Sequence, residues 1–181
     1  MTSARSVTLV YGKTGSGKTH WVREHTANTP RLLVWECFGE YVPIAPTISE
    51  CIQRVRANPT TFRVGYDPVG VDEVKAFFEI SRIVRDTTLL IEESDRLSPP
   101  RANPPYDWAV SRGRHDGTSL IVTSLTPFRT PPELRRQADV VVSFRLTEPS
   151  DLDYLAQLTT PGDAKIIRNL PLHQPHIVRL R

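Results

Sequence analysis

Hydrophobic residues along the chain form short apolar runs that alternate with longer stretches whose apolar positions recur at helical spacing. Short runs rich in Val, Ile, Leu and Thr are typical of strands, and such runs occur at 6–11, 32–35, 62–65, 87–91, 119–123 and 140–144, with an edge strand expected at 177–180. Helices are predicted between them, at 18–25, 49–57, 71–84, 106–112, 132–137 and 149–158. Four prolines exclude regular structure at 97–106.

This alternation of strands and helices predicts an α/β fold. The sheet is expected to be mainly parallel and covered by helices on both faces, which gives three layers. In such folds ligands bind at the carboxyl ends of the strands. The chain has 181 residues, enough to bury a core of its own, and we expect one domain over 1–181.

Residues 12–19 read GKTGSGKT, a complete GxxxxGK[ST] motif between a predicted strand and a predicted helix. Its glycines let the backbone N–H groups turn toward phosphates at the positive end of the helix. Lys18 is predicted to bridge the β- and γ-phosphates of ATP, and the Thr19 hydroxyl to ligate Mg²⁺. The alternative, a chance Gly/Lys turn, is disfavoured by this context. The predicted nucleotide-binding residues are Gly12, Lys13, Thr14, Gly15, Ser16, Gly17, Lys18, Thr19 and His20.

The apolar run TTLLIEE at 87–93 ends in two adjacent carboxylates. At the end of a buried strand, Glu92 is predicted to lie beside the metal and Glu93 to act as the general base that activates the attacking water. The alternative is a polar pair that merely ends a strand. Downstream of a P-loop, the pair favours hydrolysis of ATP.

Arginine dominates the positive charge, because the 23 basic residues comprise 19 Arg and 4 Lys and the net charge is +3. Guanidinium groups bind phosphate as planar forks, although a GC-rich genome or a warm habitat would produce the same bias. Residues 96–145 carry eight Arg against four acidic residues, a local balance of +4, and are the predicted polyanion-binding face. Within them, Arg112 and Arg114 of the RGRH segment are candidates for an arginine finger; the alternative is a solvated basic turn.

Several classes of protein are excluded by what the sequence lacks. No run approaches the roughly 20 apolar residues that cross a bilayer, and the first residues do not have the pattern of a signal peptide. We therefore expect a cytoplasmic protein with no membrane span of its own. Cys37 and Cys51 are the only cysteines and neither lies in a CxxC or Cys/His cluster, so a disulfide scaffold or a zinc site is disfavoured.

The succession of GKTGSGKT, LLIEESDRL, RGRHDGTSLIVTS and RRQADVVVSFRL resembles the HerA/FtsK group of P-loop ATPases, especially the genome-packaging ATPases of membrane-containing icosahedral viruses. The resemblance covers about residues 6–153. It implies a RecA/ASCE-like P-loop NTPase fold and a homo-oligomeric ring, usually a hexamer with a pentamer as the alternative. Such a ring hydrolyses ATP with Mg²⁺ to move double-stranded DNA into a capsid.

The resemblance also implies that Arg114 or Arg112 acts in trans at the neighbouring subunit. It implies a capsid vertex or a membrane-associated viral protein as partner, and a location in the host cytoplasm or at the virion vertex. One residue departs from the family pattern, because Leu125 stands where a γ-phosphate-sensing Gln is usual. Thr123 or Ser124 would then supply that contact.

Two other functions fit the P-loop. A small nucleotide or metabolite kinase would use RGRH as a lid over the phosphates, but it has no need of paired carboxylates, because its acceptor hydroxyl is already positioned. A nucleotide-binding assembly protein that never hydrolyses ATP would give Glu93 no catalytic role. The carboxylate pair favours the ATP-driven motor.

Overall fold

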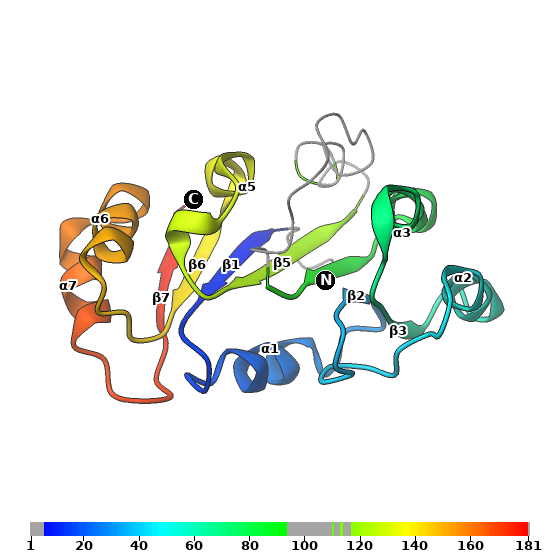
Figure 1. The fold of residues 1–181 in the computed structure, drawn as a ribbon, viewed down its shortest axis with the longest axis horizontal. Coiled ribbons are helices and arrows are strands. Elements are labelled where there is room, and N and C mark those ends of the chain that lie inside the picture. The colour runs from blue at the N-terminus through cyan, green and yellow to red at the C-terminus, as the bar shows by residue number, and fades with distance from the viewer. Residues whose placement is uncertain (1–5, 94–109, 111–112, 114–116, 181) are drawn as a thin grey trace.

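The computed structural model describes residues 6–93, 110, 113 and 117–180. These residues form a seven-stranded sheet flanked by helices (Figure 1). The strand order is β3-β2-β4-β5-β1-β6-β7, and every neighbouring pair is parallel except β6 and β7, which are antiparallel. The predicted α/β fold with a mainly parallel sheet is confirmed.

All seven predicted strands are present, with ends within two residues of the predicted ones. They are β1 (Val7–Tyr11), β2 (Arg31–Trp35), β3 (Phe62–Tyr66), β4 (Thr88–Ile91), β5 (Ser119–Ser124), β6 (Val140–Ser143) and β7 (His176–Arg179). The predicted helices are present as α1 (Lys18–Thr26), α2 (Ile48–Ala57), α3 (Gly70–Val84), α5 (Pro132–Gln137) and α6 (Pro149–Leu158).

Two helices do not follow from the hydrophobic pattern: the 3₁₀ helix η3 (Pro127–Arg129) and α7 (Pro161–Arg168). The proline-rich segment 97–106 lies outside the described residues, and so does the helix predicted at 106–112, apart from Val110. In the described part of the chain, no helix combines the length and the hydrophobicity needed to cross a membrane.

The sheet is buried on both faces, because successive strand residues point to opposite sides. One face carries Leu9, Leu33 and Leu89, which pack in a large cluster with buried residues of α2, α3, α5, α6 and α7. The opposite face carries a smaller cluster that includes Val10, Leu90 and, from α1, residue Val22. Both faces therefore hold the central strands rigidly, and the loops at their carboxyl ends start from fixed positions.

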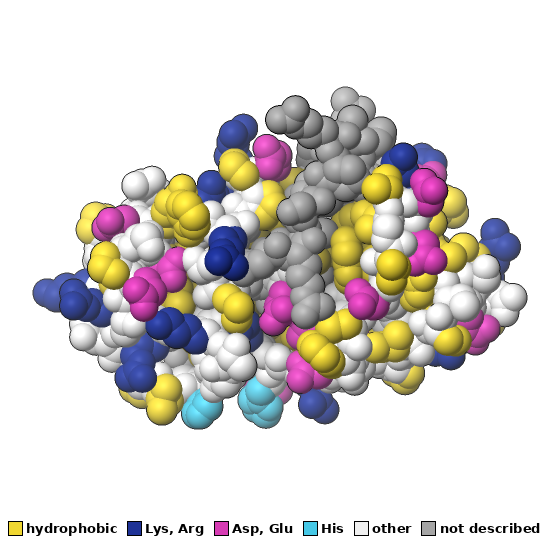
Figure 2. All heavy atoms as spheres, in the orientation of Figure 1, with side chains coloured by type: hydrophobic (Ala, Val, Ile, Leu, Met, Phe, Trp, Pro, Cys, Tyr) yellow, Lys and Arg dark blue, Asp and Glu magenta, His cyan; other side chains and the backbone are white. Residues whose placement is uncertain are grey.

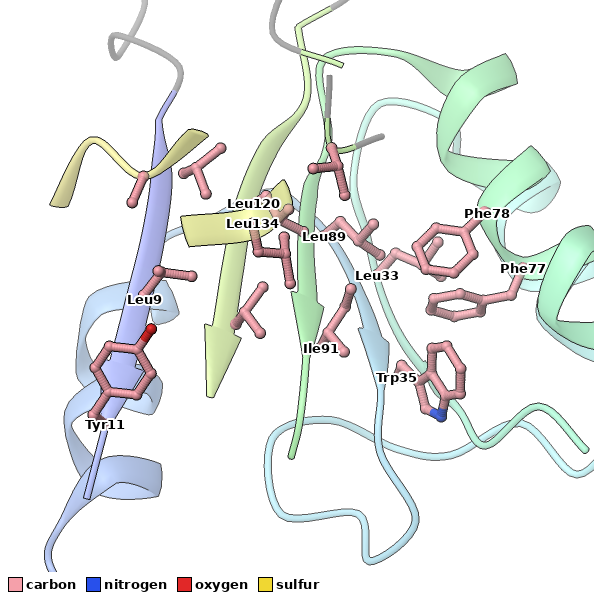
Figure 3. Packing of buried hydrophobic residues seen from close by; sticks show 14 of the residues in the cluster. Leu9, Tyr11, Leu33, Trp35, Phe77, Phe78, Leu89, Ile91, Leu120 and Leu134 are labelled. Atoms are coloured by element: carbon pink, nitrogen blue, oxygen red, sulfur yellow. The ribbon is translucent and has the colours of Figure 1, made fainter. Parts of the chain in front are cut away.

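Three aromatic rings fill the larger cluster between β2 and α3 (Figure 3). Trp35, Phe77 and Phe78 lie with ring centroids 5.9 Å apart in edge-to-face pairs. This arrangement is the favoured one for aromatic side chains and adds to the stabilisation from burial. It fixes the end of β2, from which the loop toward the P-loop departs.

Candidate nucleotide-binding and catalytic site

The P-loop joins β1 to α1 through a backbone path that requires glycine. Gly15 and Gly17 have φ of 75° and 105°, in the left-handed region that other residues rarely adopt. A Cβ atom at Gly12 would lie 2.5 Å from the Ser16 Oγ and 2.9 Å from the Phe144 Cβ, so the loop has no room for one. The resulting curl exposes the first N–H groups of α1 as a site for an anion.

Lys18 is held across the loop by main-chain oxygens. Its Nζ donates hydrogen bonds to the carbonyl oxygens of Gly12 at 2.6 Å and of Lys13 at 3.2 Å. These bonds keep the ammonium group over the concave side of the loop, where an anion would bind. The geometry is that of a loop preorganised for phosphate.

Glu92 and Glu93 follow β4, which is separated from β1 only by β5. The Glu93 N–H donates to the Thr123 Oγ1 of β5 at 3.0 Å. Glu93 has φ of 50°, in the left-handed region that is uncommon for residues other than glycine. Such backbone conformations cluster at functional sites, where the surrounding structure maintains them.

One cavity of about 530 Å³ brings the P-loop and these carboxylates together. Glu92, Glu93 and Thr123 line it on one side and P-loop residues on the other. Figure 2 shows acidic side chains gathered near the centre of the molecule, above the region of α1. Of the predicted nucleotide-binding residues, the cavity is lined by Thr14, Gly15, Ser16, Gly17, Lys18, Thr19 and His20, whereas Gly12 supports the loop and Lys13 lines a neighbouring cavity.

Thr123 and Ser124 differ in how they are engaged. The Ser124 hydroxyl donates to the Thr126 carbonyl oxygen at 2.8 Å, in the turn after β5. Thr123 lines the cavity, and its hydroxyl accepts the Glu93 N–H, which leaves its own proton available to donate. Thr123 is therefore the better placed of the two to contact a γ-phosphate.

The loop after β2 contributes residues that the sequence did not single out. The Thr19 Oγ1 donates to the Glu40 Oε2 at 3.3 Å, and the Tyr41 hydroxyl lies within reach of the side chains of Thr19 and Glu92. Burial, with the nearby charges of Glu40, Glu36 and Glu93, raises the pKa of Glu92 to about 7. Tyr41 thus connects the hydroxyl and the carboxylate that are the predicted metal ligands.

A buried carboxylate holds that loop in place. Glu36, at 2% exposure, accepts the N–H groups of Glu40 at 2.6 Å, Tyr41 at 3.2 Å and Val42 at 3.1 Å. Gly65 of β3 makes room for it, since a Cβ there would lie 3.2 Å from the Glu36 Oε1. Burial raises the pKa of Glu36 even though these N–H groups lower it. The carboxylate works as a clamp on the loop that carries Glu40 and Tyr41.

The oxygen donors around Thr19 fit Mg²⁺. Its hydroxyl lies beside the Glu40 carboxylate, and Tyr41 links it to Glu92. Among the described residues, no group of three or more His, Cys, Asp and Glu side chains is arranged to hold a metal alone. Mg²⁺ at nucleotide sites takes one or two protein oxygen ligands and completes its shell with phosphate and water, so a partial protein set suits it.

Arg112 and Arg114 lie outside the described residues. Gly113, between the two in the sequence, is described, and its carbonyl oxygen accepts the Thr118 N–H at 2.8 Å. Thr118 immediately precedes β5, whose other end carries Thr123. At about 3.3 Å per residue, Gly113 is therefore roughly 15–20 Å from the cavity along the strand direction.

Sequence comparison and fold comparison give different results. No family model and no curated protein matches the chain. The fold, however, is similar to that of the genome packaging NTPase B204 from Sulfolobus turreted icosahedral virus 2 in complex with AMPPCP, with a TM-score of 0.79 and 18% identity over 98% of this chain and 94% of that one. It is also similar to VirB4 of Thermoanaerobacter pseudethanolicus, with a TM-score of 0.61 and 12% identity over 96% and 89% of the two chains. The N-terminal domain of zonular occludens toxin from Neisseria meningitidis gives a TM-score of 0.54 and 16% identity over 80% and 78%. The chain has the P-loop ATPase fold of these proteins, as the succession of its motifs predicted.

Proposed function

We propose that this protein is an ATPase that uses the hydrolysis of ATP to move double-stranded DNA into a viral capsid. The observation that carries the proposal is the single cavity in which the P-loop faces Glu92, Glu93 and Thr123. A kinase has no need of this carboxylate pair. The fold similarity to the genome packaging NTPase B204 supports the packaging role.

Each side chain of the site has a role that its position supports. Lys18 and the N–H groups of the loop bind the phosphates, while Thr19 and Glu92 hold Mg²⁺. The metal, when bound, neutralises part of the phosphate charge. Glu93 takes a proton from the attacking water. The Thr123 hydroxyl accepts the Glu93 N–H and donates its own proton to the γ-phosphate.

The arginine finger comes from a neighbouring subunit in this proposal. Gly113 lies at the amino end of β5, far from the cavity at the carboxyl end, so an arginine next to Gly113 in the sequence is expected to serve the site of a neighbouring subunit. A ring, with six subunits as the expected number, brings the arginine of one subunit to the nucleotide of the next. In this proposal the basic segment 96–145 of each subunit binds DNA. The ring docks on a capsid vertex or a membrane-associated viral protein.

Turnover of ATP with and without double-stranded DNA tests the activity. We expect DNA to stimulate hydrolysis and small hydroxylated acceptors to have no effect, whereas a kinase would require the acceptor. Lys18→Ala should lose nucleotide binding, while Glu93→Gln should keep it and lose hydrolysis. Glu50→Gln, in the first turn of α2 and outside the cavity, is the matched control and should behave as the wild type. Native turnover in Glu93→Gln would contradict the assignment of the base.

Mixed rings test the arginine. A Lys18→Ala subunit keeps its arginine but binds no ATP. A subunit with Arg114→Ala or Arg112→Ala binds ATP but lacks that arginine. Mixing the two creates some interfaces with both groups intact, so hydrolysis should partly return. Co-assembled mixtures that stay inactive with both arginine variants would contradict action in trans.

A further inference from the structure

A cavity of about 360 Å³ lies between α5 and α6. Both helices cover the same face of the sheet, because Leu134 of α5 and Leu155 of α6 are buried in the larger cluster (Figure 1). None of the described residues that line this cavity also lines the nucleotide cavity. It is therefore a separate site on the surface. Its walls are Pro132, Arg135, Arg136, Tyr154, Gln157 and Leu158.

One face of each helix forms these walls. The lining residues are 132, 135 and 136 on α5 and 154, 157 and 158 on α6, and this spacing places each set on a single side of its helix. The acidic residues of the two helices lie elsewhere. Glu133 and Asp153 do not line the cavity, and Asp151 is buried, where it accepts the Thr126 hydroxyl. The described walls therefore carry two guanidinium groups and no carboxylate.

Arg135 is held in place by two contacts. Its guanidinium lies over the Tyr154 ring, 4.6 Å from the ring centroid, and its Nη1 donates to the Pro127 carbonyl oxygen at 3.4 Å. Tyr154 is in turn positioned by Phe128, whose ring packs edge-to-face against it with centroids 5.4 Å apart. An arginine fixed in this way loses little side-chain freedom when a ligand binds, so the cost of ordering it is small.

Apolar groups lie beside the two arginines. Pro132 and Leu158 line the cavity, and Phe128, next to Tyr154, is 58% exposed. Aromatic residues and arginine are enriched at the centres of protein–protein interfaces. The backbone of duplex DNA presents mainly phosphate and sugar, so it would use the guanidinium groups but gain little from the apolar walls. The combination favours a peptide over DNA.

We propose that the cavity between α5 and α6 docks an acidic peptide segment of a partner protein, with a carboxylate on the two arginines and an adjacent apolar side chain against Leu158. Charge complementarity identifies the occupant, since guanidinium groups bind carboxylates through paired hydrogen bonds. The inference rests on the proposed function, which includes a docking protein but names no surface for it. Arg135 and Arg136 belong to the basic segment 96–145, and for these two residues the apolar walls favour a protein ligand instead of DNA.

Fluorescence anisotropy with labelled peptides tests the site. The first probe is a short peptide that alternates acidic residues with Leu and Phe. A second probe has Gln in place of the acidic residues, and a third has Ser in place of the apolar ones. We expect the first to bind and the other two to bind at least about tenfold more weakly, because each lacks one half of the complementary surface.

Substitution of the arginines locates the binding. Arg135→Ala and Arg136→Ala should each weaken binding of the first peptide by about five- to fiftyfold, since each removes charge-assisted hydrogen bonds to a carboxylate. Arg168→Ala, at an exposed arginine of α7 outside the cavity, is the matched control and should bind as the wild type.

Tyr154 is a positioning residue for Arg135 in this inference. Tyr154→Leu removes the ring beneath the guanidinium and should weaken peptide binding by about three- to tenfold, whereas Tyr154→Phe keeps the ring and should restore binding to within about twofold of the wild type. In an Arg135→Ala background, Tyr154→Leu should cause little additional loss, because the ring acts through the arginine. A full additional loss in the double variant would overturn this positioning role.

A labelled DNA duplex decides between the two kinds of ligand. We expect Arg135→Ala and Arg136→Ala to weaken DNA binding by less than about threefold. A wild type that binds none of the peptides, unchanged peptide affinity in both arginine variants, or a larger loss of affinity for DNA than for the peptide would overturn the docking site. The proposed function would stand in each case if DNA still stimulates ATP turnover. Peptide binding without any DNA-stimulated turnover would refute the proposed function and leave the docking site supported.

Discussion

Replacing Glu36 by alanine removes the clamp that holds the loop after β2 beside the nucleotide cavity. Three N–H groups, from Glu40, Tyr41 and Val42, lose their acceptor in this variant. The expected result is a coupled loss of stability and of activity. Tyr41 is the residue through which the second loss arises, because its hydroxyl links Thr19 to Glu92.

The loss of stability follows from the burial of each donor. The bond to Val42 is fully buried, and an unsatisfied buried N–H costs about 1–3 kcal/mol. The bonds to Glu40 and Tyr41 are only part-buried, so water replaces the carboxylate and each contributes about 0.5–1 kcal/mol. Removing a buried charge, whose cost appears as the raised pKa of Glu36, offsets part of this sum. We expect a net decrease in the free energy of unfolding of about 2–4 kcal/mol.

Urea unfolding followed by tryptophan fluorescence measures this decrease, with Trp35 next to the clamp as one of the reporters. Glu36→Gln keeps one acceptor oxygen and should fall between the wild type and Glu36→Ala. Glu50→Ala, at a half-buried acid that pairs only with Arg54 on the helix surface, should change the free energy of unfolding by less than about 1 kcal/mol. The Mg²⁺ concentration for half-maximal ATPase activity should rise in Glu36→Ala and stay unchanged in Glu50→Ala. A Glu36→Ala protein with wild-type stability and wild-type Mg²⁺ dependence would refute the claim that Glu36 holds the loop after β2 in place.

Three further perturbations test other parts of the structure. Gly17→Ala should weaken ADP binding at least about tenfold in calorimetry, because φ of 105° and the nearby Phe144 ring disfavour any side chain; unaltered binding would contradict the observed loop. Asp163, whose pKa is lowered by hydrogen bonds from His176 and Thr160, should stabilise the fold above its unfolded pKa of about 4 and lose that effect as the pH falls. The difference in free energy of unfolding between the wild type and Asp163→Asn, measured by urea titration, should therefore become smaller from pH 6 to pH 3. A difference independent of pH would contradict a stabilising interaction between Asp163 and His176. Phe77→Ala should lower the free energy of unfolding by about 3–5 kcal/mol, and a change below about 1 kcal/mol would exclude the aromatic cluster as a core element.

The strands could be predicted because the sheet is covered on both faces. A strand buried on two sides must be apolar at every position, and such a run is visible without knowledge of its partners. Helix α7 does not follow from the hydrophobic pattern, because only two of its eight residues, Ala164 and Ile167, are buried. The physical signal was nevertheless present. The Thr160 hydroxyl caps the helix by accepting the Asp163 N–H at 3.1 Å, and Pro161 occupies the first turn.

The P-loop could be recognised because its residues are contiguous, so their spacing alone defines the backbone path. Glu36, Glu40 and Tyr41 have no such signal. They lie in a loop whose composition is that of an ordinary turn, and only the pairing of β2 with β4 brings that loop beside Glu92. His173 also lines the cavity, and it lies in the loop between α7 and β7, which the antiparallel pairing of β7 with β6 brings back toward the P-loop. Contacts between residues that are distant in the sequence leave no pattern in the local sequence from which they could be predicted.

The placement of β5 between β1 and β4 supports the prediction that Thr123 takes the role expected of a Gln at position 125. Thr123, at 1% exposure, is fixed on one side by strand pairing to Val10 of β1. In the other direction its hydroxyl accepts the Glu93 N–H. A hydroxyl that accepts from the backbone of the proposed base keeps one proton to donate toward a γ-phosphate. One small side chain, held on a central strand, can therefore relate the phosphate to the base, a role for which a longer Gln side chain beyond the strand is not required.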